Sequence, residues 1–123
     1  MKLIKRWLPT VVMMAIIFTM SSITGKTIRE AGLGDEGYHV SGHFILFFFL
    51  CMSLYKGTKN VWLSILFTML YAFTDELHQL FVSERAASFK DIATDSLSAF
   101  VAGGILWKYY QNLPKILKNW LDS

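Results

Sequence analysis

The chain has little cysteine and little charge. Its single cysteine, Cys51, cannot form an internal disulfide, and we interpret it as a small apolar filler residue. Charged residues make up only 17% of the 123 positions, and the lysines lie at the ends of apolar stretches instead of forming a basic stripe. That placement argues against nucleic acid as a partner, although the net charge is +3. No internal repeat or low-complexity segment is evident.

Apolar residues, in contrast, are abundant, at 54% of the chain. A soluble domain of this size would have too little interior to bury them. Four apolar stretches with almost no internal charge therefore predict an all-α, polytopic membrane protein with a bundle of four transmembrane helices. We expect one domain, 1–123, with helices at about 7–22, 41–56, 61–82 and 90–110. A soluble bundle that uses these stretches as core helices is the alternative.

The two ends of the chain carry further signals. The basic N-terminus, followed by an apolar run, resembles a signal peptide. Residues 20–24 offer no Ala-x-Ala-like cleavage site, however. We therefore expect the first helix to be retained as an anchor. Near the C-terminus, apolar residues recur at helical spacing over 113–122, with lysines opposite them. This pattern predicts a short helix that lies in the membrane interface.

The positive charges predict an orientation. With the N-terminus inside, the cytoplasmic segments hold eight Lys and Arg residues and the outer segments hold four. This bias favours both termini on the cytoplasmic side. All four tryptophans fall on that same side, as one half of an aromatic belt would. The turn at 56–59 is short, which predicts that the second and third helices form an antiparallel hairpin.

This topology brings polar residues from all four helices to the outer leaflet. At about 100° per residue, Asp75, Glu76, His78 and Gln79 cover one arc of the third helix. Asp91 and Asp95 continue as a stripe through Ser98 on the fourth helix, among small residues that allow close packing. Ionisable residues at membrane depth indicate a functional site. The expected group is Ser21, Ser22, His43, Asp75, Glu76, Gln79, Arg85, Asp91 and Asp95.

Several chemistries fit these residues. Four carboxylates at the same depth in the membrane would repel one another and need a counter-charge, which Arg85 could supply through its planar guanidinium. A divalent cation such as Mg²⁺ is the other candidate, with Asp75, Glu76, Asp91 and Asp95 as possible ligands. His43, Glu76 and Asp75 are the candidate catalytic groups for proton transfer. A purely structural role, in which these groups cap helices and satisfy one another, is the alternative.

The same residues resemble those of the VanZ-like family of bacterial membrane proteins, named for an accessory factor in teicoplanin resistance. The first helix ends in serines, Ser21 and Ser22, and the second begins with a histidine, His43. The third ends in Asp-Glu-x-x-Gln, which is Asp75, Glu76 and Gln79, and an arginine, Arg85, follows it. The fourth begins with Asp-x-x-x-Asp, which is Asp91 and Asp95. Val40 departs from the pattern, because the family usually has a basic residue there. Ser98 and Ala102 stand where glycines are common.

The resemblance implies a multi-pass protein of the bacterial cytoplasmic membrane that acts in cell-envelope physiology or glycopeptide resistance. We expect an outward-facing pocket that binds a lipid headgroup, a cell-wall precursor or a glycopeptide, with Arg85, Gln79, Asp91, Asp95, Ser21 and Ser22 as binding residues. A metal-dependent transferase or hydrolase acting on lipid-linked phosphate is one alternative. A non-catalytic assembly partner is the other.

Overall fold

In the computed structural model, the residues described are 2–22, 27, 30–32, 36–82 and 89–122, and all regular structure among them is helical. The long helices are α1 (Lys2–Ser21), α3 (Glu36–Thr58), α4 (Val61–Gln79) and α5 (Phe89–Lys108). A 3₁₀ turn (Tyr110–Asn112) leads into the short helix α6 (Lys115–Asp122). The all-helical part of the predicted fold class is therefore confirmed for the described residues.

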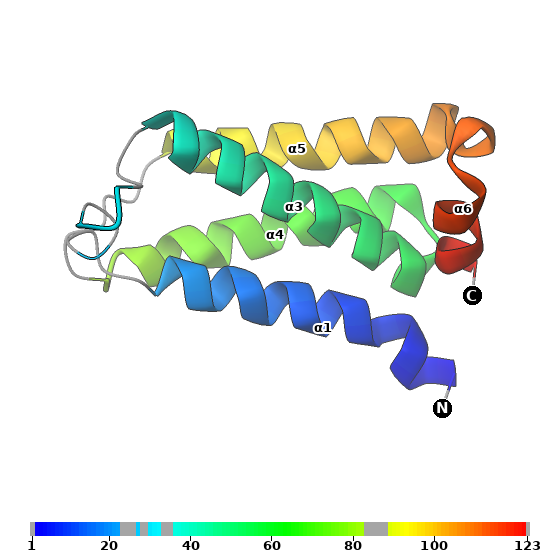
Figure 1. The fold of residues 1–123 in the computed structure, drawn as a ribbon, viewed down its shortest axis with the longest axis horizontal. Coiled ribbons are helices and arrows are strands. Elements are labelled where there is room, and N and C mark those ends of the chain that lie inside the picture. Colours follow the sequence, from blue (N-terminus) through cyan, green and yellow to red (C-terminus); the bar gives the residue numbers. More distant parts are fainter. Residues whose placement is uncertain (1, 23–26, 28–29, 33–35, 83–88, 123) are drawn as a thin grey trace.

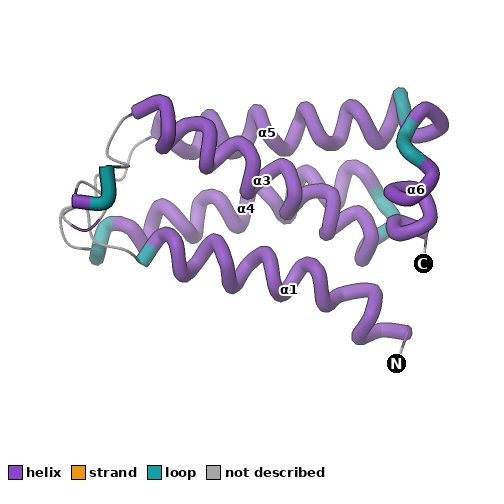
Figure 2. Tube along the Cα trace, viewed as in Figure 1, coloured by secondary structure: helices purple, strands orange, loops and turns teal. Residues whose placement is uncertain are grey.

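The four long helices lie side by side and alternate in direction along the chain (Figure 1). Helix α3 is central, since it packs against α1, α4 and α5. Both termini lie at the same end of the bundle, and α6 crosses that end (Figure 2). The beginning of α3, the end of α4 and the beginning of α5 therefore meet at the opposite end.

A tight turn joins α3 to α4, and its local chemistry explains why the chain reverses there. Lys59 has a φ of 56°, a left-handed conformation that ends α3. Asn60 then caps α4, with its side-chain oxygen accepting a hydrogen bond from the backbone N–H of Leu63 at 3.0 Å. The predicted helical hairpin follows from these two residues.

The interior and the surface have an unusual distribution of polarity. Among the described residues, 13 buried positions are polar or charged and 12 are hydrophobic, so the interior is not an ordinary apolar core. The outer surface is instead rich in large apolar side chains. On α4, for example, Leu66, Leu70 and Phe73 are 49%, 52% and 52% exposed. About half of the buried positions are thus polar or charged, while many large apolar side chains face outward.

Close packing between α4 and α5 depends on small residues. Ala99 and Ala102 are completely buried on α5, in a cluster with Ile65 of α4. A β-carbon at Gly103 would lie 2.4 Å from Ile65 Cδ1, which is closer than nonbonded carbons approach. A larger residue at this position would therefore require Ile65 or one of the two helices to move.

Helix α6 is held by hydrogen bonds to the end of α3 and to the turn between α3 and α4. The Lys56 ammonium, on a residue only 2% exposed, donates to the Trp120 carbonyl at 2.6 Å and lies 5.2 Å from the indole centroid. Lys59 donates to the Leu121 carbonyl. The Tyr110 hydroxyl donates to the Asp122 carboxylate, and this hydrogen bond raises the pKa of Tyr110 to about 12. The C-terminal segment is thus held by contacts that local helix propensity could not have indicated.

One described helix, α1, is long and apolar enough to cross a membrane by length and composition. It begins at Lys2, closer to the N-terminus than the expected start near residue 7, and it tolerates Pro9 within its length. Helices α3, α4 and α5 each carry buried polar or charged side chains.

Candidate functional site

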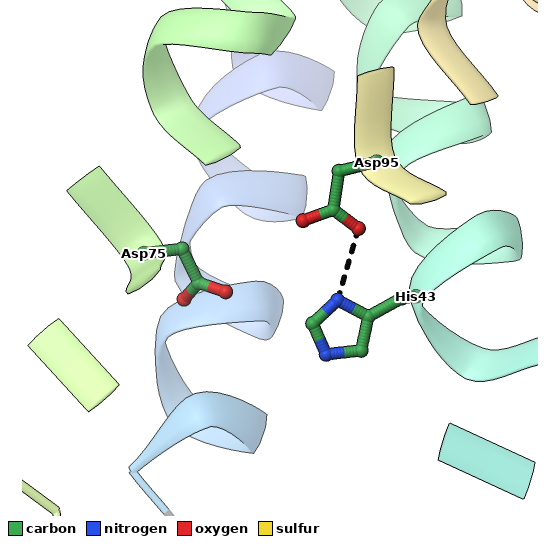
Figure 3. Close-up of side chains that lie close together, drawn as sticks. All are labelled: His43, Asp75 and Asp95. Carbon is green, nitrogen blue, oxygen red and sulfur yellow. Dashed lines mark hydrogen bonds and ion pairs between the residues drawn. The ribbon is translucent and has the colours of Figure 1, made fainter. Parts of the chain in front are cut away.

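Three titratable side chains from three helices converge at the end of the bundle opposite the termini. They are His43 of α3, Asp75 of α4 and Asp95 of α5 (Figure 3). His43 Nδ1 lies 2.9 Å from Asp95 Oδ1. Each of the three residues offers one potential ligand atom, and these atoms all lie within 4.8 Å of one another. Their exposed fractions are 9%, 4% and 0%, so the group is shielded from solvent.

The faces predicted from helical spacing agree with the burial. On α4, Asp75, Glu76 and Gln79 of the predicted arc are buried and His78 is half-buried, whereas Leu77 and Leu80 are exposed. On α5, the predicted stripe is buried along its whole length, with exposed fractions of 6% or less at Asp91, Asp95, Ser98 and Ala102. We call the six buried residues His43, Asp75, Glu76, Gln79, Asp91 and Asp95 the polar cluster.

Neighbouring contacts fix the position of the histidine. Ser98 Oγ of α5 donates to the Phe44 carbonyl of α3 at 2.6 Å, which ties the two helices together one residue after His43. The Phe47 ring lies 6.0 Å from the imidazole, centroid to centroid. If Asp95 is ionised, His43 Nδ1 carries the proton of the 2.9 Å hydrogen bond. The imidazole is thus held in one orientation by groups on its own helix and on α5.

Gln79 and Asp95 of the polar cluster have buried atoms without hydrogen bonds among the described residues. Gln79 is completely buried, and neither its amide nitrogen nor its amide oxygen has a partner. Asp95 Oδ2 is in the same situation. A buried polar atom that lacks a hydrogen bond costs roughly 1–3 kcal/mol, so a native protein rarely retains one without a reason. Binding of a polar ligand or an ion would supply the missing interactions.

The serines at the end of α1 divide between two environments. Ser21 is 4% exposed. Ser22 contacts His78 instead of the polar cluster, with its Oγ 2.9 Å from His78 Nε2. The His78 ring also stacks on Phe18, at a centroid distance of 4.5 Å. These contacts join α1 to α4 beside the polar cluster. Arg85, the predicted counter-charge, lies outside the described residues.

The sequence placed His43, Asp75 and Asp95 in one expected group, and the structure adds that their potential ligand atoms lie close together. We expected the acidic residues as candidate metal ligands and His43 as a proton donor or acceptor. The geometry instead groups the histidine with Asp75 and Asp95 in a set suited to a cation. The spacing of residues within a helix could not reveal this, because each of the three comes from a different helix. The buried Lys56 was also missed, since its position at a helix end favoured an exposed topology signal.

These features define a class: a helical protein whose buried polar site is assembled from three helices at one end of a bundle. Comparison with known families is more specific. The family model described as VanZ/LLP1 matches residues 6–111, and the chain belongs to this family. No curated protein matches the chain, and no solved structure matches it either.

Proposed function

We propose that this VanZ/LLP1 protein is a multi-pass protein of the bacterial cytoplasmic membrane that acts in the cell envelope. In this proposal the polar cluster binds the polar part of an envelope molecule at the outer leaflet. The candidate ligands are a lipid headgroup, a lipid-linked cell-wall precursor and a glycopeptide such as teicoplanin. The observation that carries the proposal is the completely buried Gln79, whose amide makes no hydrogen bond among the described residues.

The distribution of polarity supports the membrane part of the proposal. Large apolar side chains cover the outside of the bundle while polar residues fill much of its interior. In water this arrangement would expose far more apolar surface than a soluble monomer tolerates. In a bilayer it is favourable, because lipid tails solvate the outer face and helix partners satisfy the inner polar groups.

The position of the polar cluster supports an outward-facing site. The cluster lies at the opposite end of the bundle from both termini. The excess of Lys and Arg on the terminal side favours the cytoplasm for that end. The polar cluster would then be at the outer leaflet, where envelope lipids and cell-wall precursors present their headgroups.

The orientation has a direct test. In a Cys51→Ser background, a single cysteine is introduced at the exposed Glu30 or at the exposed Asn119. We expect a membrane-impermeant maleimide to label Glu30→Cys in intact cells and Asn119→Cys only after permeabilisation. The reverse result would place the polar cluster on the cytoplasmic side and contradict an outward-facing site.

Ligand binding is tested with the purified protein in detergent. Native mass spectrometry would record adducts with short-chain phosphatidylglycerol, a polyprenyl phosphate and teicoplanin, each added separately. We expect at least one of these probes to be retained by the wild type and lost by Gln79→Leu. That substitution removes the buried amide at nearly constant volume, so the variant should fold at least as well as the wild type.

The matched control is Asn119→Leu, which removes an exposed amide at the other end of the bundle. Retention equal to that of the wild type is expected for this variant. The proposal fails if no probe is retained by the wild type, or if Gln79→Leu retains it equally. Loss of cluster variants from the membrane, with no binding by the wild type, would instead support the assembly-partner alternative.

An enzymatic function on lipid-linked phosphate is the second candidate, and one observation favours it. The hydrogen bond from His43 to Asp95 orients the imidazole, as general acid–base catalysis requires. Incubation of the protein with polyprenyl diphosphate, with and without Mg²⁺, would test it by phosphate release. Turnover that is abolished in Asp95→Asn supports this candidate, and the absence of turnover removes it.

A further inference from the structure

The residues His43, Asp75 and Asp95 have the composition and spacing of a metal site. Each comes from a different helix, and the three potential ligand atoms lie within 4.8 Å of one another. In Figure 3 the Asp75 carboxylate faces the His43–Asp95 pair, and one oxygen of Asp95 faces toward Asp75. We propose that these three side chains bind one divalent transition-metal ion, Mn²⁺ or Zn²⁺.

The distance between His43 and Asp95 fits two ligands of one ion. Ligands that lie about 2.1 Å from a metal and at right angles to each other are about 3.0 Å apart. His43 Nδ1 and Asp95 Oδ1 are 2.9 Å apart. The ion would therefore replace the proton that these two atoms share, and neither side chain would need to move far.

The third ligand needs a small adjustment. Ligands on opposite sides of an ion are separated by roughly 4.2–4.4 Å at these bond lengths. The largest separation in the group is no more than 4.8 Å, so a shift of a few tenths of an ångström in the Asp75 carboxylate would complete the site. The terminal torsion of an aspartate is broad, which makes such a shift inexpensive.

A second observation points to a ligand at this place. Asp95 is completely buried, and its Oδ2 has no hydrogen-bond partner among the described residues. A cation bound by both oxygens of the Asp95 carboxylate would satisfy Oδ2 as well as Oδ1, and it would offset the repulsion between two carboxylates in a medium of low dielectric constant. The mixed set of one imidazole and two carboxylates suits Mn²⁺ or Zn²⁺ better than Mg²⁺ or Ca²⁺, which prefer oxygen ligands alone.

This inference rests on the proposed function in one respect. An ion held by three protein ligands keeps open positions, and these would bind a phosphate or carboxylate oxygen of the headgroup. The ion would also connect α3, α4 and α5, the helices that form the site. Neither the family match nor the family pattern in the sequence indicates such an ion.

The test uses the purified full chain in detergent, treated with a chelator and titrated with Mn²⁺. Electron paramagnetic resonance of free Mn²⁺ gives the stoichiometry, for which we expect one ion per chain. Pulsed measurements on the bound ion should detect coupling to one imidazole nitrogen. The coupling should disappear in His43→Gln and persist in the matched control His78→Gln, while Asp95→Asn should weaken binding at least about 10-fold.

A further variant keeps the test valid even if His43→Gln does not fold. The double substitution His39→Gln/His78→Gln leaves His43 as the only histidine of the chain. Nitrogen coupling must persist in it, and its loss would overturn the proposal. The absence of bound Mn²⁺ and Zn²⁺ in the wild type would overturn it as well.

The two proposals can fail separately. If the chelator-treated protein retains a headgroup adduct and binds no ion, the metal site is wrong and the headgroup site remains. If the ion binds with nitrogen coupling and no probe is retained, the metal site stands and the proposed ligand class is wrong.

Discussion

His43 Nδ1 and Asp95 Oδ1 lie 2.9 Å apart in a pair that joins α3 to α5 across the interior of the bundle. Asp95 is completely buried, so its charge depends on groups within the protein for compensation. The stability of the fold and the chemistry of the site therefore depend on the same hydrogen bond.

The first prediction concerns this pair. The substitution His43→Leu should lower the free energy of unfolding by about 3 kcal/mol, because it leaves the Asp95 carboxylate buried without its hydrogen bond. Adding Asp95→Leu to that variant should recover more than half of the loss, since the uncompensated charge is then removed. Unfolding in mixed micelles, followed by circular dichroism, measures both values. Additive losses in the double variant would contradict the coupling.

The second prediction concerns the contact between α4 and α5. Gly103→Ala would place a β-carbon 2.4 Å from Ile65 Cδ1 and 2.7 Å from Ile65 Cγ1. We expect a loss of about 1–3 kcal/mol, because both helices must shift or Ile65 must leave its preferred rotamer. Ile65→Val in the same background should recover part of it. Gly104→Ala is the matched control, since nothing lies within 4 Å of its added β-carbon. Equal stability of the two alanine variants would refute this account.

The third prediction concerns the attachment of α6. Lys56→Met keeps an apolar side chain of similar length and removes the hydrogen bond to the Trp120 carbonyl together with the cation–π contact. Helix α6 should then detach more often, so trypsin should cleave after Lys115 several times faster than in the wild type. Lys108→Met is the control, because Lys108 is exposed and contacts only the neighbouring Tyr109 ring among the described interactions. An unchanged cleavage rate in Lys56→Met would exclude this role.

The fourth prediction concerns pH. The hydrogen bond to Asp122 raises the pKa of Tyr110 from 10.0 to about 12. Because the folded protein binds this proton more tightly than the unfolded chain, the contribution of Tyr110 to the attachment of α6 is present below pH 10 and is lost as the pH rises to about 12. The phenolate absorbance of the wild type minus that of Tyr110→Phe isolates this titration. In Asp122→Asn the midpoint should fall toward 10, and an unchanged midpoint would rule out Asp122 as the cause.

The sequence predicted some parts of the site well. Burial of the Asp91–Asp95–Ser98–Ala102 stripe followed from spacing alone, because a helical period places these residues on one face. The same reasoning separated the buried arc of α4 from exposed Leu77 and Leu80. Such predictions succeed because they depend only on geometry within one helix.

Other parts depend on packing between helices and were not predictable in this way. The topology predicted His43, Asp75 and Asp95 at the same end of the bundle, but the approach of their ligand atoms to within 4.8 Å requires the relative rotation of three helices, which no spacing within one helix encodes. The burial of Lys56 depends on where α6 folds back, 64 residues further along the chain at Trp120. The membrane topology itself stays a prediction, because among the described helices α1 alone passes the test of length and composition for a membrane span.

The hairpin of α3 and α4 has a consequence for biosynthesis in the proposed membrane. Helix α4 ends in Asp75, Glu76, His78 and Gln79, a combination that a lipid environment disfavours in an isolated segment. Asp75 is buried at the place where His43 of α3 and Asp95 of α5 approach it, with one ligand atom of each residue within 4.8 Å of the others. The insertion machinery would therefore have to retain α3 and α4 together until α5 emerges from the ribosome. The chemistry at one end of the bundle thus constrains the order in which the chain enters the bilayer.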